Sequence, residues 1–390
     1  MPSPSIAHRI LQPHPTPSSP CRSVRPMSPP PPSTLEDVLD HYTIRSTLFS
    51  LLDPLSLIRL QRCSRKLHSH APEMHKTQWN LPRFLTRWVR DPAAFRRQMA
   101  ANDAILAGSA ALQFFDRTHY PDSDLDVLFT GAGNNGPEAT KCYAKLASVA
   151  AHLVAAEGYT PHAPPGIDWA RATGKELFGS LARRRRRDSP AAHREISGTY
   201  PLLFDVFEFR KGPRRVQLVM YERSALESVL TAHSTVVMNF VGWDCAYSLF
   251  PAYTFGSRQS LVNRVPDAGT AKVMSKWRGR GFAFGWKKVV GDGLGPENDA
   301  EFQAPTMDPF RRVRSLADRH CWRLELDTAG LEDVSAQTVS RDMVFGTVCD
   351  YFSGRDPFGY PGACVSFRFF RYDSPVERPE GVAGVVGGGV

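Results

Sequence analysis

The sequence lacks the features that mark several large classes of protein. Its seven cysteines include no C-x-x-C pair, which argues against a disulfide scaffold and against a zinc site built from thiolates. No run of about 18 apolar residues occurs, so no membrane span is expected. A phosphate loop of the form G-x-x-x-x-G-K-S/T and a G-x-S-x-G nucleophile elbow are also missing. We therefore expect an intracellular protein, cytoplasmic or nuclear, that is not a P-loop enzyme.

Acidic residues are missing from the first 33 positions, which hold eleven prolines and three arginines. This Pro/Ser-rich composition predicts a disordered tail over 1–33. The formal net charge of the chain is +9, and five of the positive charges come from the run Arg183–Arg187. The basic character is therefore local. It predicts a disordered basic loop at about 180–198, with nucleic acid as a partner through 183–187.

Order is expected to begin near residues 33–36, and 37–67 has helical periodicity with a break at Asp53–Pro54. A second helical pair is expected over 83–99. Mixed helix and strand follow: strands at 104–106 and 125–130, helices at 110–117 and 140–157, and a β-hairpin over 202–221. A helix is expected at 223–232, a buried strand within 234–243, and later strands at 322–327 and 364–372. The fold class is α+β.

One short segment carries chemistry that a purely structural strand does not need. Gly108-Ser109 lies between an apolar strand and a helix, where backbone N–H groups and the helix dipole favour a phosphate. Asp124 and Asp126 follow, separated by one leucine, so on a strand both carboxylates face the same way. Two carboxylates beside a phosphate cradle suit Mg²⁺ or Mn²⁺ bound to a nucleoside triphosphate. The alternative is a capped turn whose carboxylates are solvated.

This arrangement resembles the signature of the nucleotidyltransferase superfamily, the DNA polymerase beta-like fold. With "FRRQ" before it and "VVMNFVGW", "FPAYTF" and "KWRGRGF" after it, the segment is also similar to uncharacterised fungal proteins with an F-box-like helical segment before that fold. The resemblance implies a mixed sheet with flanking helices. It implies that Asp124 and Asp126 ligate the metal and that Gly108 and Ser109 hold the triphosphate.

The resemblance also implies a third carboxylate on a later strand, and here the sequence departs from the family. The matching position in "VQLVM" is Gln217, which cannot act as a base and is a poor ligand for a hard cation. Asp205, and less favourably Glu208, are the candidates to replace it, although a solvent-facing acid explains Asp205 equally well. Lys276 and Arg278 are candidate contacts for phosphate oxygens, with a solvated basic loop as the alternative.

The segment "IRSTLFSLLDPLSLIRLQRCSRKLHS" resembles an F-box, with Leu48, Leu52, Leu57 and Leu60 around the Asp53-Pro54 break. The resemblance implies docking of the adaptor subunit of a cullin-type ubiquitin ligase through 43–67. His41-Tyr42-Thr43 stands where the family has Leu-Pro. A helical cap packed on the α/β domain is the alternative interpretation.

Two functions therefore stand side by side: a nucleotidyltransferase-fold protein that binds Mg-nucleotide, with transfer activity undecided, and a ubiquitin-ligase recognition subunit. A basic nucleic-acid-binding protein without chemistry is a third hypothesis. The predicted organisation is a tail over 1–33, the F-box-like segment over 34–80, the nucleotidyltransferase-like domain over 81–290, a β-rich extension over 291–375 and a flexible tail over 376–390.

Overall fold

The computed structural model describes residues 34–131, 136–162, 166–179, 203–262, 268–286, 314–334, 344–350 and 364–370. The predicted tails at 1–33 and 376–390, the basic loop at 180–198 and the run at 183–187 lie outside these residues. Within them, no helix is both long enough and apolar enough to cross a membrane. The described chain is a mixed α+β protein, which confirms the predicted fold class.

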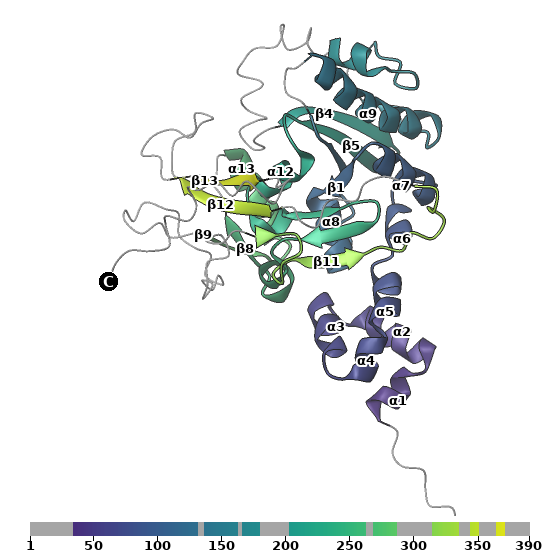
Figure 1. Ribbon diagram of the computed structural model, residues 1–390, viewed down its shortest axis with the longest axis vertical. Helices are drawn as coiled ribbons and strands as arrows, with labels where there is room; N and C mark the ends of the chain where they lie inside the picture. The colour runs from purple at the N-terminus through teal and green to yellow at the C-terminus, as the bar shows by residue number, and fades with distance from the viewer. Residues whose placement is uncertain are drawn as a thin grey trace, which may run out of the picture.

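The first part of the chain is a group of short helices at one end of the molecule (Figure 1). The predicted break is confirmed: Asp53 accepts a hydrogen bond from the backbone of Ser56 and so caps the helix that begins at Pro54. Two further breaks, at Asp40–His41 and Arg62–Ser64, divide what the periodicity joined. The helices are α1 (Leu35–Leu39), α2 (Tyr42–Leu51), α3 (Pro54–Gln61), α4 (Arg65–Ser69) and α5 (Ala71–Gln78).

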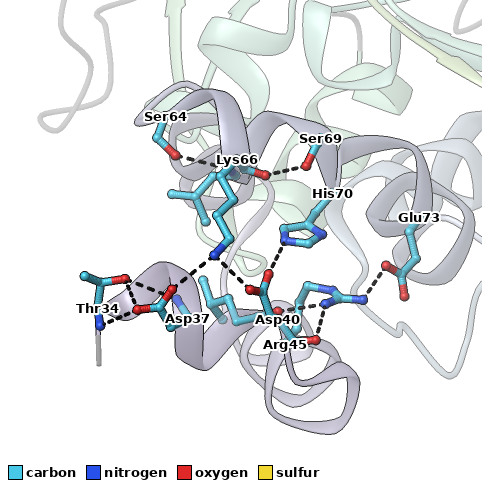
Figure 2. Close-up of polar contacts among 11 residues, drawn as sticks. Thr34, Asp37, Asp40, Arg45, Ser64, Lys66, Ser69, His70 and Glu73 are labelled. Carbon is cyan, nitrogen blue, oxygen red and sulfur yellow. Dashed lines mark hydrogen bonds and ion pairs between the residues drawn. The ribbon is translucent and has the colours of Figure 1, made fainter. Parts of the chain in front are cut away.

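Ion pairs hold these helices to one another, as Figure 2 shows. Lys66 of α4 reaches Asp37 at 3.2 Å and Asp40 at 2.8 Å, next to the end of α1. Arg45 of α2 pairs with Glu73 of α5 at 2.6 Å and also donates to the carbonyl of Leu39. The helical group is thus cross-linked by polar contacts as well as by its small apolar core.

A large mixed sheet forms the body of the protein. Its strand order is β11-β7-β6-β1-β2-β5-β4-β3, and only the β2–β5 pair among these is parallel. The strands are β1 (Ile105–Ala107), β2 (Leu125–Phe129), β3 (Thr160–Pro161), β4 (Leu203–Lys211), β5 (Arg214–Tyr221), β6 (Asn239–Val241), β7 (Cys245–Ser248) and β11 (Trp322–Glu325). The predicted hairpin and the strands near 105, 125 and 322 are confirmed.

Helices cover both faces of this sheet. One apolar core joins β2 and β5 to α7 and α9 and continues into the helical group through Phe49 and Leu57. A second core lies on the other face, where α12 packs over Leu128, Val219 and Tyr221. The covering helices are α6 (Leu81–Leu85), α7 (Pro92–Ala101), α8 (Gly108–Asp116), α9 (Gly136–Ala155), α12 (Ala225–Leu230) and α13 (Ala268–Arg278).

The remaining elements lie toward the C-terminal part of the chain (Figure 1). They are the 3₁₀ turn η1 (Thr235–Val237), the π-helical turn η2 (Ala252–Gly256), β8 (Gln259–Val262), β9 (Ala283–Trp286), β10 (Arg314–Ser315), β12 (Val344–Asp350) and β13 (Cys364–Phe370). Strands β8 and β9 pair in parallel, and β10, β12 and β13 form a separate antiparallel sheet. The buried strand predicted within 234–243 is confirmed for its second half, β6, whereas its first half forms η1, where Ser260 accepts a hydrogen bond from the backbone N–H of Val236.

Candidate functional site

A close approach between a glycine and a carboxylate defines the centre of the site. Strand β1 ends at Ala107, and Gly108 turns the chain into α8 with a φ of +62°. A Cβ atom placed on Gly108 would lie 2.3 Å from Oδ2 of Asp126. Any other residue there would suffer both backbone strain and a steric overlap with the carboxylate. The structure therefore requires glycine where the sequence predicted a phosphate-binding turn.

The two aspartates lie together, as their spacing predicted. Asp126 is paired with Ala107 on one side and Gln217 on the other in the β-ladders. Asp124 lies one residue before β2, and its negative charge acts on Asp126. Leu125 between them is fully buried on the opposite face. This is the arrangement that brings two carboxylates to one side of a strand.

The electrostatic environment of the aspartates is unusual for surface carboxylates. Burial, and then the charge of Asp124, raise the pKa of Asp126 to about 7, although Lys276 and Arg215 oppose the shift. No hydrogen-bond donor among the described residues satisfies the Asp126 carboxylate. Burial also raises the pKa of Asp124, against the opposing charge of Arg215, whose Nε lies 2.7 Å from Oδ1 of Asp124. Arg215 thus pairs directly with Asp124, whereas among the described residues Asp126 has no direct ion-pair partner and is opposed only by the charges of Lys276 and Arg215.

Gln217 takes the position at which the resemblance implies a third carboxylate. It lies beside Asp126 on β5, and its Nε2 donates a hydrogen bond to Oδ2 of Asp124 at 3.2 Å. The amide therefore orients Asp124 and adds no negative charge. Among the described residues, no group of three or more His, Cys, Asp or Glu side chains is arranged to hold a metal ion.

The structure does not bring Asp205 into this site. Asp205 is paired with Met220, and the side chain of Tyr143 on α9 donates a hydrogen bond to its carboxylate. Met220 and α9 belong to the core on the other side of the sheet from Asp126 and Gln217. Glu208 is instead paired directly with Gln217 across the β4–β5 ladder, and it forms an ion pair with Arg210.

Of the two basic residues predicted from α13, the structure places Lys276 in the site and Arg278 outside it. Lys276 lines the cavity together with Asp126, and burial lowers its pKa, as does the charge of Arg280. Arg278 is not in the cavity wall, and its guanidinium lies 5.3 Å from the ring centre of Phe284 on β9. Residues two apart on a helix point about 200° apart, so they seldom share a site.

The cavity beside Asp126 has a volume of about 220 Å³. Its polar lining comes from the Gly108–Ser109 turn, Asp126, Gln217 and Lys276. The lining also includes Val219, Tyr221, Val229, His233 and Trp277, which sequence reasoning did not assign to a site. The alternation of side chains along the predicted hairpin could have identified two of these residues, because Val219 and Tyr221 lie on the same strand face as Gln217.

The apolar residues predicted to dock an adaptor are largely turned toward the protein itself. Leu57 is fully buried, and Leu52 and Leu60 are partly buried against the main core. Ile44 and Leu51 are the large apolar side chains of 43–67 that stand exposed, at 47% and 78%.

Comparisons with protein-family models, with curated proteins and with solved structures gave no match for this chain. The functional interpretation therefore rests on the geometry of the residues around Gly108 and Asp126.

Proposed function

We propose that the protein binds a nucleoside triphosphate together with Mg²⁺ or Mn²⁺ in the cavity at Gly108 and Asp126, within a nucleotidyltransferase-like domain. The observation that carries the proposal is the Asp126 carboxylate. It lines the cavity, none of the described residues donates a hydrogen bond to it, and it touches the turn that begins α8.

The residues of this cavity suit a metal ion that is held jointly by the protein and by the phosphates of a bound ligand. Two carboxylates supply too few oxygens to enclose Mg²⁺, which prefers six ligands and commonly takes several from phosphates and water. Asp124 and Asp126 would hold the ion, which would neutralise charge on the phosphates. The α8 backbone and the Ser109 hydroxyl offer hydrogen-bond donors to phosphate oxygens, and Lys276 adds a positive charge.

The same residues favour binding over transfer. Nucleotidyl transfer needs a group that helps to deprotonate the acceptor, and Gln217 has no proton affinity suited to that role. Asp205 is directed to the opposite face of the sheet. Glu208 is the acid next to Gln217, and its negative charge is engaged by Arg210. We therefore propose nucleotide binding as the function of this site.

Isothermal titration of the full chain with ATP and MgCl₂ tests the proposal. We expect saturable binding that is lost in EDTA and weakened about tenfold or more in Asp126→Asn, since each 1.4 kcal/mol corresponds to a factor of ten. Asp122→Asn is the matched control, because it removes the same charge from an exposed residue in the loop just before β2. Binding that is equal in all three proteins contradicts the proposal.

A second proposal is docking of a cullin-type ubiquitin-ligase adaptor through 43–67. It is supported by the exposure of Ile44 and Leu51 on α2, while Leu52 and Leu57 are used for internal packing. A pull-down with purified adaptor tests it, with Leu51→Asp as the variant that removes exposed apolar surface without disturbing the core. Capture by the unaltered protein and loss in Leu51→Asp support docking; no capture rejects it.

A further inference from the structure

A second cavity, of about 440 Å³, lies where α5, α6 and α8 meet. Three arginines line it: Arg83 and Arg87, in and just after α6, and Arg117 at the end of α8. The rest of the wall consists of amide and hydroxyl side chains with Phe84 and Phe114, and it includes no carboxylate. The cavity is therefore strongly positive.

The three arginines differ in how far the protein already satisfies them. Arg117 is largely engaged, because it donates to the carbonyls of Phe49 and Leu52 and to Oε1 of Gln78. Its nearest acids are Asp53 and Asp116, and Asp116 is itself paired with Arg258 at 2.6 Å. Arg117 thus ties the helical group to the body of the protein.

Arg87 and Arg83 have no carboxylate partner among the described residues. Arg87 lies over the ring of Phe84 and reaches Oε1 of Gln113 and the carbonyl of Thr118 only at 3.5 Å, at the limit of a hydrogen bond. Burial lowers the pKa of Arg87. The Arg83 side chain is exposed at the cavity edge, and no described group accepts a hydrogen bond from it.

A partly buried guanidinium without a counter-charge is costly, because the lost hydration is not replaced. Arg45 shows the usual solution in this chain, since it is buried and pairs with Glu73 at 2.6 Å. A structural role explains Arg117, but it does not explain why the half-buried Arg87 faces this polar cavity without an acid, with the exposed Arg83 beside it. An anionic ligand supplies the missing charge.

We propose that this cavity is a phosphate-binding site, which takes the phosphate groups of a small polyphosphate or of a single-stranded nucleic acid backbone. The planar guanidinium matches two phosphate oxygens at once. Nine residues of α8 separate this end of the helix from Gly108, which corresponds to about 14 Å. The site is therefore distinct from the Asp126 cavity and does not depend on the function proposed for it.

Two binding measurements on the full chain test the site and distinguish the ligand sources. The first is calorimetric titration with sodium pyrophosphate in EDTA, and the second is fluorescence anisotropy with a labelled oligouridylate of about 12 nucleotides. The test variant is Arg83→Gln with Arg87→Gln. The charge-matched control is Arg59→Gln with Arg62→Gln, two exposed residues of α3 and its C-terminal cap. Lys276→Gln reports binding at the Asp126 cavity.

For a polyphosphate site we expect the test variant to lose pyrophosphate affinity by about tenfold or more, whereas both other variants keep it. For a nucleic-acid site we expect a loss of oligonucleotide affinity together with a shallower salt dependence, by about 0.7 per phosphate contact removed. If neither ligand distinguishes the test variant from the α3 control, or if Lys276→Gln alone abolishes binding, the inference is wrong. Arg83→Gln alone keeps the test decisive should the double variant unfold, because the exposed Arg83 side chain makes no hydrogen bond or ion pair with the described residues.

Discussion

The Nε2 atom of Gln217 donates a hydrogen bond to Oδ2 of Asp124 at 3.2 Å, across the parallel pair β2–β5. The amide restrains the Asp124 carboxylate, and it stands where the resemblance implies a third acid. Because an amide brings no negative charge, Gln217 adds no further repulsion to that of Asp124, Asp126 and the neighbouring Glu208. This contact shapes what the site can bind.

Replacement of Gln217 by Glu tests this relationship. We expect Gln217→Glu to lower the unfolding temperature in EDTA, because three carboxylates then crowd one partly buried spot. Addition of MnCl₂ should restore more stability to the variant than to the original protein, by mass action of a bound cation. Thermal unfolding with and without Mn²⁺ measures both effects. Gln217→Met is the control, because methionine has a similar volume and no charge. Its unfolding temperature should not fall through charge repulsion, and Mn²⁺ should stabilise it no more than it stabilises the original protein.

Gly108→Ala should be disruptive for two reasons that can be separated. The left-handed backbone strains any L-residue by about 1–2 kcal/mol, and the new Cβ would overlap Oδ2 of Asp126. Gly158→Ala is the matched control, since Gly158 has a φ of +73° and nothing within 4 Å of an added Cβ. Chemical unfolding should show a greater loss for Gly108→Ala than for Gly158→Ala. Equal losses would mean that the contact with Asp126 carries no energetic weight.

The raised pKa of Asp126, about 7, predicts how stability depends on pH. An unfolded aspartate has a pKa of about 3.9, so between about pH 4 and 7 the native state holds a proton that the unfolded state has lost. The free energy of unfolding should therefore fall as pH rises through this window and level off above pH 7. Asp126→Asn should remove this fall. Urea unfolding at a series of pH values measures it, and parallel curves for the two proteins would contradict the assignment.

Arg117 should contribute strongly to the attachment of the helical group. It donates to two carbonyls and to Gln78, which lie in or beside α2 and α5. Arg117→Met should lower the free energy of unfolding by roughly 2 kcal/mol or more, because buried acceptors lose a charged donor. Limited proteolysis should cut sooner within 34–80. Arg62→Met, at an exposed position, should leave both measurements unchanged within about 0.5 kcal/mol.

Sequence reasoning reached much of this site because its patterns are local. The strand–Gly-Ser–helix order, the Asp-Leu-Asp spacing and the position of Gln217 on the next strand all depend on short-range periodicity. That Gln217 lies near the aspartates was implied only by the resemblance, and the parallel pairing of Asp126 with Gln217 is seen only in the structure. The sequence also suggested the helix break at Pro54, since an aspartate before a proline caps a new helix.

The errors have physical reasons that the sequence partly contained. Asp205 shares its strand face with Phe207 and Phe209, which are buried in the main core, so the period of two already favours the core face for Asp205. Arg278 lies two residues after Lys276 on one helix, so helical periodicity directs the two side chains to different sides of that helix. The arginine cavity was missed because Arg83, Arg87 and Arg117 come together only through the packing of α6 against α8.

The most direct test of the central claim is a crystal structure of the full chain with Mn²⁺ and a non-hydrolysable ATP analogue. We predict an anomalous Mn²⁺ peak within coordination distance of carboxylate oxygens of Asp124 and Asp126, with the triphosphate against the Gly108–Ser109 turn. A nucleotide bound elsewhere, or a cavity that contains the analogue without a metal between these two carboxylates, would contradict the account.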